Sequence, residues 1–480
     1  MILKHFYDEK LAQASYLLGC AATGEALVVD PNRDVDTYLQ AAQTAGLRVT
    51  HVTETHIHAD FVSGARELAE RTGARLHLSD EGDADWKYAY ASEYDAVLLR
   101  DGDTFRVGNV RVDVMHTPGH TPEHLSFVVT DTAGADRPMG VFTGDFVFVG
   151  DVGRPDLLEK AANVAGTMEG AARTLFQSLQ RFKAELPDFV QIWPGHGAGS
   201  ACGKALGAVP QSTMGYERLF NWGLAADDEG EFVAVVLAGQ PEPPKYFAQM
   251  KRINKVGPRV LGGFPRPPQL TSELPGLIDE RALVVDTRAA PAYARAHVPG
   301  TLNVPVNRSF NTWAGWLLPY ENDFYLIVER TERVDEAVRD LAMIGLDRVK
   351  GFFTADVIDA WRGAGRETGT VRQITADELA DQIASGRMDV VDVRGATEWE
   401  AGHLPGVPNV PVGYLAERIG ELPAERPVVV HCQGGARSAI AASLLLANGV
   451  QEVVNLTGGY QEWVAGGHPV EREEAAAGAR

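Results

Sequence analysis

The chain has 480 residues, which is too long for one domain and favours two to four. A formal net charge of −21 disfavours nonspecific binding to nucleic acid or to an anionic membrane. No uninterrupted apolar run reaches the roughly 20 residues that a membrane span needs, and acidic residues stand where a signal peptide would be apolar. We therefore expect a cytoplasmic protein with neither nucleic acid nor membrane as a partner.

The first half of the chain alternates strand-like runs with segments of helical spacing. Apolar and polar residues alternate over residues 1–30, which predicts two or three antiparallel strands. Apolar spacing predicts helices over 34–45, 63–72 and 161–186. Further short strands are predicted over 47–52, 76–78, 96–99, 104–107, 110–116, 125–130, 140–143 and 189–193. Two β-rich halves with helices outside them indicate an α/β fold of the αββα sandwich type.

Ligand-type side chains follow the strand predicted over 47–52. His56, His58 and Asp60 form the pattern His-x-His-x-Asp soon after it. Three further ligand-type residues each follow a strand-like run and have glycine one position earlier: His120, Asp145 and His196. Glycine lets the chain turn sharply, so these side chains are expected to meet in one cleft at the sheet edge. The spacing suits a divalent metal better than a catalytic triad, because no serine or cysteine nucleophile stands beside it.

Residues 239–276 are rich in proline and glycine and are the expected junction out of the first domain. Within them, the segment 246–253 is compatible with a helix against the active site. Beyond the junction the chain repeats itself. Val284-Val285-Asp286 and Asn303-Val304-Pro305 recur, at one constant offset, as Val390-Val391-Asp392 and Asn409-Val410-Pro411. We expect domains over 1–250, 270–365 and 373–472, of which the last two are copies of one α/β domain.

Among the three cysteines, Cys432 has the setting of a reactive thiol. A buried-strand pattern over 427–431 runs into Cys432-Gln433-Gly434-Gly435-Ala436-Arg437-Ser438, and a helical run follows. Backbone N–H groups and the helix dipole stabilise an anion in such a loop, and Arg437 adds a positive charge, so we expect a lowered thiol pKa. In the middle copy Val328 runs into Glu329 with no cysteine, so that copy is predicted to be catalytically inactive.

These motifs resemble those of two known families. Residues 1–250, with their six ligand-type positions in this order, resemble the metallo-β-lactamase superfamily. Residues 373–470 resemble rhodanese domains, on Asp392-Val393-Arg394, Glu398, the Cys-x4-Arg loop and Leu456-Thr457-Gly458-Gly459-Tyr460. Related phosphatases have a loop one residue longer, so the short loop favours the smaller sulfane sulfur. The implied fold is a metallo-β-lactamase αββα sandwich followed by two rhodanese-like domains.

More narrowly, the chain resembles fusions of persulfide dioxygenases with rhodanese domains. Two further stretches support this resemblance: Gly153-Arg154-Pro155-Asp156 and residues 194–204. The resemblance implies one non-haem Fe(II) per chain, in a facial triad with positions open for substrate sulfur and O₂. The implied ligands are His56, His120 and Asp145. Residues expected around the metal, orienting ligands, water or substrate, are His58, Asp60 and His196. Further candidates at the substrate are Arg154, Lys204 and Cys202, the last as a thiol relay or a small buried residue.

The implied activity has two steps. A low-molecular-weight persulfide is oxidised with O₂ to sulfite and free thiol, and Cys432 with Arg437 transfers sulfane sulfur to sulfite, giving thiosulfate. Such a pair of steps serves sulfide detoxification. Glutathione, coenzyme A and bacillithiol remain open as the thiol carrier, and the family implies a homo-oligomer.

Phe61 bears on the main alternative. Two-metal hydrolases of the superfamily, such as glyoxalase II, have the motif His-x-His-x-Asp-His, whose last position here is Phe61. Phenylalanine cannot bind a metal, which favours one metal. The alternative is a glyoxalase II-like zinc thiolesterase with a rhodanese appendage, acting through metal-bound hydroxide. A third class is a sulfur carrier or scaffold, in which Cys432 relays persulfide to partners.

Overall fold

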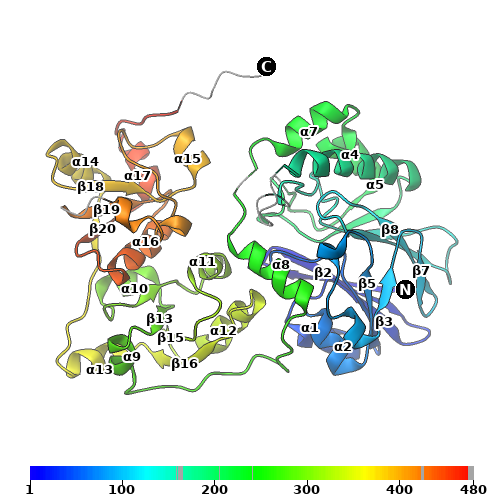
Figure 1. Cartoon of the computed structure of the whole chain (residues 1–480), viewed down its shortest axis with the longest axis horizontal. Helices are drawn as coiled ribbons and strands as arrows, with labels where there is room; N and C mark the ends of the chain where they lie inside the picture. The colour runs from blue at the N-terminus through cyan, green and yellow to red at the C-terminus, as the bar shows by residue number, and fades with distance from the viewer. Residues whose placement is uncertain (158, 160–165, 205, 241, 423–425, 474–480) are drawn as a thin grey trace. The chain divides into compact units, whose positions relative to one another are not determined.

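The computed structural model describes residues 1–157, 159, 166–204, 206–240, 242–422 and 426–473. The chain divides into two compact units (Figure 1): residues 1–265 with 339–345, and the remainder. The division at residue 265 falls within the predicted junction, and the three predicted domain ranges themselves stay predictions. Within the described residues, no helix is long and apolar enough to span a membrane.

The first unit is built on two six-stranded sheets. The first sheet follows chain order: β1 (Ile2–Asp8), β2 (Gln13–Cys20), β3 (Glu25–Val29), β4 (Arg48–Thr53), β5 (Arg75–Ser79) and β6 (Val97–Leu99). β1 to β3 pair antiparallel, and β3 to β6 pair parallel. Helices α1 (Val35–Thr44) and α2 (Ala65–Thr72) make the first two crossovers, because parallel neighbours cannot be joined by a tight turn.

The second sheet carries most of the later ligand positions. Its order is β12 (Ser212–Thr213), β11 (Gln191–Pro194), β10 (Gly140–Gly144), β9 (Leu125–Asp131), β8 (Val110–His116) and β7 (Thr104–Val107). The helices that follow are α4 (Met168–Glu185), α5 (Met214–Phe220), α6 (Trp222–Ala225), α7 (Glu229–Leu237) and α8 (Tyr246–Val256). The helix predicted over 161–186 is α4, and residues 161–165 lie outside the described residues.

Apolar cores between and outside the sheets hold these layers together. The central core lies between the sheets and joins Tyr16 of the first to Phe127 and Trp193 of the second. One outer core packs α1 and α2 on the first sheet, and the other packs α4 and α7 on the second. Figure 1 shows α1 and α2 on one side of this unit and α4, α5 and α7 on the other. The predicted αββα sandwich is therefore confirmed.

The second unit holds two four-stranded parallel sheets that share the order of three strands and carry the fourth at opposite edges. One has the order β14 (Leu302–Asn303), β13 (Leu283–Asp286), β15 (Phe324–Val328), β16 (Val349–Thr354). The other has the order β18 (Asp389–Asp392), β19 (Val428–His431), β20 (Val453–Leu456), β17 (Arg372–Ile374). Its helices include α9 (Leu274–Asp279), α10 (Ala290–Arg295), α11 (Phe310–Leu317), α13 (Val357–Gly363), α14 (Ala376–Ala384), α15 (Ala396–Ala401), α16 (Ala436–Ala447) and α17 (Gly459–Ala465).

The sequence repeat is also a repeat of hydrogen bonds. The Asn303 side-chain amide donates to two carbonyl groups at the end of β13, at 2.8 and 2.9 Å. Asn409 makes the corresponding pair at the end of β18, at 3.1 and 2.9 Å. Each asparagine thereby ties the chain that returns to the sheet to the first strand of that sheet. The repeated motif thus has the same local role in both copies.

Candidate metal centre and thiol loop

Glycine brings the predicted ligand loops into contact. β10 and β11 are parallel neighbours, so Asp145 and His196, which follow them, emerge at one sheet edge. Gly144 has a φ of 47°, and a Cβ there would stand 2.3 Å from the Thr55 hydroxyl in the first ligand loop. A Cβ at Gly195 would stand 2.8 Å from the Asp145 carboxylate. Any larger residue would push these loops apart, and the positive φ at Gly144 agrees with the turn predicted there.

His56, His120 and Asp145 form a buried cluster, and their ligand-type atoms all lie within 4.8 Å of one another. Asp145 Oδ2 is 3.9 Å from His56 Nε2 and 3.6 Å from His120 Nε2. Both carboxylate oxygens of Asp145 are buried and accept no hydrogen bond from the described part of the chain. Such a buried carboxylate is costly unless a cation pairs with it. The residues present therefore fit a divalent metal held by these three side chains.

Hydrogen bonds behind the two histidines set the direction of their Nε2 atoms. The Thr55 hydroxyl donates to Asp30 at 2.9 Å and lies 3.0 Å from His56 Nδ1, whose proton it can therefore accept. The carbonyl of Arg154 lies 3.2 Å from His120 Nδ1 and accepts in the same way. Each histidine then presents an unprotonated Nε2 to the cluster, which is the form that a metal needs.

Burial keeps both histidines neutral. It lowers the pKa of His56, and the neighbouring histidines lower that pKa further. Burial also lowers the pKa of His120, although the Asp145 charge opposes it. Burial acts on His58 in the same direction, but Asp30 at 3.1 Å outweighs it and raises the His58 pKa to about 9. His58 is thus the charged partner of Asp30, which is compatible with its predicted place outside the metal's ligand set.

Asp30 is expected to affect metal affinity indirectly, through the residues that support the metal ligands. It accepts hydrogen bonds from the backbone N–H and the hydroxyl of Thr55, and it pairs with His58. Its φ of 49° is a conformation that asparagine also adopts readily, so Asp30→Asn changes the charge with little backbone strain. We expect Asp30→Asn to weaken metal binding about 10- to 100-fold, as loss of such support usually does. Competition with a chelator measures this, with the exposed Asp36→Asn as control. Equal affinities of the two variants would contradict the prediction.

Asp60, His196 and Cys202 form a second buried cluster beside the first, with ligand-type atoms also within 4.8 Å. His196 Nε2 is 3.2 Å from Asp60 and 3.4 Å from Asp145. Burial raises the pKa of the Cys202 thiol to about 12, and the Asp145 charge adds to the shift. The structure thus brings Cys202 close to the candidate metal site as a protonated thiol. The roles predicted for these three residues stay predictions.

Phe61 is fully buried, and its ring lies 4.5 Å from the ring of His58. Helix α8 holds this loop, because the Asn254 amide donates to the carbonyls of His58 and Phe61 at 2.8 and 2.7 Å. Asn254 also accepts from the backbone N–H of Ser63 at 2.9 Å. The helix predicted over 246–253 is therefore present and lies against the metal loop. Sequence reasoning missed Asn254, since one asparagine in a helix carries no motif.

Arg154 and Lys204, predicted at the substrate, make contacts within the protein. Arg154 is fully buried, pairs with Asp156 at 2.9 Å and donates to the Ala201 carbonyl at 2.8 Å. Lys204 Nζ donates to the Val235 carbonyl at 2.6 Å. Arg154 thereby ties its own loop to the loop that carries Cys202. A role of either residue at the substrate stays a prediction.

Two buried acids that support the ligand loops were missed from the sequence. Asp30 is one, and Glu123 is the other. Glu123 accepts the backbone N–H of Ile57, between the first two histidines, at 2.8 Å, and burial raises its pKa to about 7. The position of Glu123, three residues after His120, was the available signal.

The thiol loop lies in the second unit between β19 and α16. Cys432 is buried, and its sulfur accepts from the backbone N–H of Gly435 at 3.1 Å and faces the Ser438 hydroxyl at 3.6 Å. These donors point at the sulfur as the sequence predicts. Arg437 pairs with Glu398 through two contacts of 2.5 and 2.7 Å, which fixes the guanidinium beside the loop. Sequence reasoning placed Glu398 in the motif without this partner.

The middle copy supports the helix that closes the thiol loop. α16 packs against β14, where the buried backbone N–H of Asn303 donates to the Ser443 hydroxyl at 2.9 Å. Ser443→Ala leaves that N–H without an acceptor, so we expect the unfolding free energy to fall by about 1–3 kcal/mol. Urea unfolding measures it, with Ser385→Ala at the exposed end of α14 as control. Equal losses in the two variants would contradict the prediction.

Comparison with known families agrees with this architecture. The model of the metallo-beta-lactamase superfamily matches residues 9–196, and that of the rhodanese-like domain matches residues 375–466. A crystal structure of a metallo-beta-lactamase from Staphylococcus aureus subsp. aureus COL is 42% identical, covers 74% of this chain and 98% of its own, and superposes with a TM-score of 0.66. The chain therefore belongs to the metallo-β-lactamase superfamily and carries a C-terminal rhodanese-like domain. A second such domain over 270–365 stays a prediction.

Curated relatives of this chain bear the names of both dioxygenases and hydrolases. A mitochondrial persulfide dioxygenase of Bos taurus is 28% identical over 41% of this chain and 68% of its own length. A hydroxyacylglutathione hydrolase of Rhodopseudomonas palustris is 30% identical over 47% of this chain and 88% of its own. A beta-lactamase hydrolase-like protein of Xylella fastidiosa is 30% identical over 53% of this chain, and the match spans only 60% of that relative's length.

Proposed function

We propose that the chain is a non-haem iron persulfide dioxygenase joined to a thiosulfate-forming sulfurtransferase. The observation that carries the proposal is the buried cluster of two histidines and one carboxylate, His56, His120 and Asp145, with Phe61 at the position where hydrolases place a further histidine. Two histidines and one carboxylate leave coordination positions open, as oxygenases require. The likeness to a bovine persulfide dioxygenase and the rhodanese-like domain support the same substrate chemistry at both sites.

The residues around the cluster have separable tasks. Held by His56, His120 and Asp145, an Fe(II) ion would supply binding positions for the persulfide sulfur and O₂ and the electrons that activate O₂. Thr55 and the Arg154 carbonyl hold the two histidines in the tautomer that binds metal. The charged His58, paired with Asp30, adds a positive group beside the cluster, which favours an anionic persulfide.

The first reaction balances with one water molecule. R–S–SH, O₂ and H₂O give R–SH, sulfite and two protons, so the terminal sulfur is oxidised, O₂ is reduced and the S–S bond breaks. Each sulfite formed should therefore consume one O₂, because both oxygen atoms of O₂ are used for one sulfur. Parallel records from an oxygen electrode and a sulfite assay test this ratio, and sulfite formed without O₂ uptake would contradict the proposal.

The second reaction takes place at Cys432. Its thiolate attacks the terminal sulfur of another persulfide, which releases R–S⁻ and leaves a Cys432 persulfide. Sulfite then attacks that outer sulfur, so thiosulfate leaves and the thiolate returns. The Gly435 N–H and the Ser438 hydroxyl are placed to stabilise negative charge on sulfur in both steps. Two sites on one chain keep sulfite close to its acceptor, in the sense of effective concentration.

A second candidate function is a thiolesterase with two metals. The cluster of Asp60, His196 and Cys202 favours it, because these three side chains could hold a second ion beside the first. So does the likeness to a hydroxyacylglutathione hydrolase. Hydrolysis of S-lactoylglutathione by the metal-loaded protein, at a rate unchanged when O₂ is removed, would favour this function over the dioxygenase.

A further inference from the structure

Seven residues from the middle copy belong to the first unit. Residues 339–345 group with residues 1–265, whereas the chain on either side of them belongs to the second unit. They form the C-terminal part of helix α12 (Arg333–Met343) and the turn that follows it. Leu341, Ala342 and Met343 are buried. Contacts of this segment lead to three loops around the candidate metal centre.

The first of these loops follows the initial ligand cluster. The backbone N–H of Val62, directly after Phe61, donates to the Met343 carbonyl at 2.7 Å. Gly345 packs against the same loop, because a Cβ there would stand 3.4 Å from a methyl group of Val62. The segment therefore holds this loop at the residue that follows Phe61.

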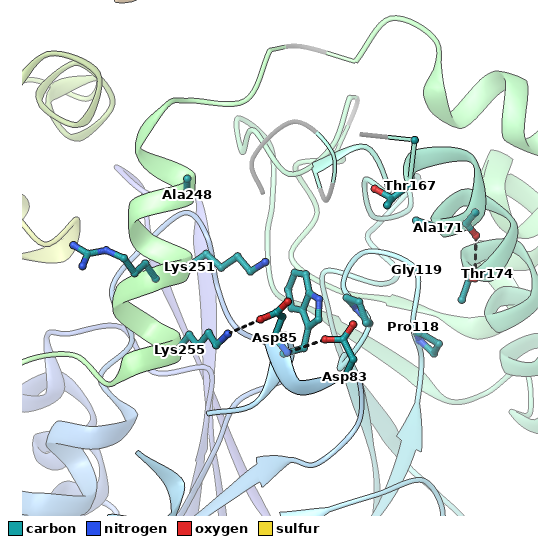
Figure 2. A pocket seen from close by; sticks show the side chains of 15 residues that line it. Asp83, Asp85, Pro118, Gly119, Thr167, Ala171, Thr174, Ala248, Lys251 and Lys255 are labelled. Carbon is teal, nitrogen blue, oxygen red and sulfur yellow. Dashed lines mark hydrogen bonds and ion pairs between the residues drawn. The ribbon is translucent and has the colours of Figure 1, made fainter. Parts of the chain in front are cut away.

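Gly345 also packs against α8. A Cβ there would stand 2.9 Å from Ile253 Cδ1 and 3.3 Å from Met250 Cε. Figure 2 shows the other face of this helix, where Lys251 and Lys255 line a cavity of about 790 Å³. Helical spacing puts Met250 and Ile253 on the face away from that cavity. A side chain at Gly345 would therefore press on the buried face of α8 and on the ligand loop, and not on the residues that line the cavity.

The second loop joins β1 to β2. Arg339 donates to the Asp8 carboxylate at 2.8 Å, and Lys10 pairs with Asp340. The side chains of the two acids are only 8% and 1% exposed, so solvent screens these pairs less than it screens surface pairs. Asp8 also accepts from the backbone N–H of Leu11 at 3.1 Å. The contact with Arg339 is thus made by a residue that shapes the turn.

This second loop holds His196. The Ala12 carbonyl lies 2.8 Å from His196 Nδ1 and accepts its proton. Ala12 has a φ of 50°, which alanine rarely adopts and which depends on the contacts that fix the turn. His196 Nε2 lies 3.2 Å from Asp60 and 3.4 Å from Asp145. A shift of the turn would therefore move His196 relative to both acids.

The third loop follows Asp30. Arg33 is buried and donates to the Ala342 carbonyl at 3.0 Å. Arg339 Nε donates to Asp34 at 2.7 Å. Asp30 itself supports the first ligand loop through its backbone. One short segment thus connects the loops that support the candidate metal centre.

We propose that residues 339–345 position the metal centre, and that the middle copy serves the first unit through them. The middle copy has no cysteine for sulfur transfer, and this contribution gives it a task that needs no thiol. Arg339 and Gly345 are positioning residues, because they act on the loops and not on the metal. The inference concerns the metal centre itself, so it goes beyond the proposed function and holds for a dioxygenase and for a thiolesterase.

The test titrates the metal-free, full-length protein with Co²⁺ against a competing chelator, and the visible absorption of bound Co²⁺ reports the geometry of its ligands. Gly345→Ala should weaken Co²⁺ binding at least about 10-fold, as loss of ligand support usually does. It should also change the absorption spectrum, because the ligand loops move.

Gly365→Ala is the matched control for this substitution. Gly345 and Gly365 both follow a helix and have left-handed φ values of 77° and 74°. A Cβ at Gly365 would meet no atom within 4 Å. The control therefore shares the backbone strain and should bind Co²⁺ like the wild type.

Arg339 provides a second variant. Arg339→Met keeps an unbranched side chain of good helix propensity but removes the contacts with Asp8 and Asp34. We expect Co²⁺ binding at least about 10-fold weaker. Arg339→Lys should recover part of the loss, because a lysine can pair with one of the two acids. Arg362→Met, at an exposed ion pair of α13, should bind like the wild type. Sulfur transfer from thiosulfate to cyanide at Cys432 should be equal in all of these variants.

Three results would overturn the proposal. The first is a Co²⁺ affinity and spectrum unchanged in both Gly345→Ala and Arg339→Met. The second is an equal loss of affinity in Gly365→Ala and Arg362→Met, which would indicate a general loss of stability. The third is a wild-type protein that binds no Co²⁺, which would remove the metal centre itself. If Co²⁺ binding follows the expected pattern but no O₂ is consumed with persulfide, the proposed dioxygenase fails and the positioning role stands.

Discussion

Asp145→Asn should abolish persulfide-dependent O₂ uptake while the chain stays folded. The amide keeps the shape of the side chain but removes the carboxylate that lies 3.9 Å from His56 Nε2 and 3.6 Å from His120 Nε2. A neutral amide is a poor partner for a divalent metal, so we expect bound metal to be lost and the oxidation rate to fall at least about 10³-fold. This loss is larger than the one that usually follows substitution of a residue that only supports a metal ligand. Metal analysis and an oxygen electrode measure the two effects.

The same variant also separates loss of metal from loss of structure. Both Asp145 oxygens are buried and accept no hydrogen bond from the described residues, so neutralising the group should not lower the stability of the metal-free protein. Thermal unfolding of the metal-free forms should show Asp145→Asn at least as stable as the wild type. Sulfur transfer at Cys432 should be unchanged, because that site lies in the other unit. Retained metal and O₂ uptake in Asp145→Asn would contradict the assignment of this ligand.

Cys432→Ser should remove thiosulfate from the products and leave sulfite in its place. The hydroxyl cannot carry a persulfide, so sulfane sulfur has no acceptor at the loop. We expect enzyme-dependent thiosulfate formation to fall at least about 10³-fold, because the nucleophile itself is lost. Chromatographic separation of sulfite and thiosulfate, with O₂ uptake recorded in parallel, measures the effect.

Controls decide whether the two sites act independently. Cys20→Ser replaces another buried cysteine, one that belongs to neither site and whose sulfur accepts from the backbone N–H of Asn109. It should leave the product ratio unchanged. O₂ uptake in Cys432→Ser should equal that of the wild type. Loss of both products in Cys432→Ser would contradict independent sites, and thiosulfate at the wild-type rate would contradict the role of the thiol.

The ligand cluster was predictable because its positions follow a local rule. Asp145 and His196 stand directly after glycine at strand ends, and parallel strands bring their carboxyl ends to one edge. Asp30 was not predictable in the same way. It follows β3 and precedes Pro31, so it reads as an ordinary turn residue, and its contact with Thr55 depends on the pairing of β3 with β4.

The second unit shows the same difference between local contacts and contacts that depend on the fold. The repeat of Asn303 and Asn409 could be read from the sequence, because each copy keeps its own local hydrogen bonds. The contact of Asn303 with Ser443 could not, since it joins the two copies and neither residue belongs to a motif. Pairs that lie far apart in the chain, such as Glu398 with Arg437, become visible only when the fold places them together.

The most direct test of the central claim is the metal and the oxygen stoichiometry of the protein purified without O₂. Glutathione persulfide and coenzyme A persulfide are added in turn, and O₂ consumption is followed. The account predicts about one iron per chain, in a site with two histidines and one carboxylate, and persulfide-dependent O₂ uptake. Zinc at one or two ions per chain, with no O₂ uptake on either persulfide, would contradict it and favour the thiolesterase.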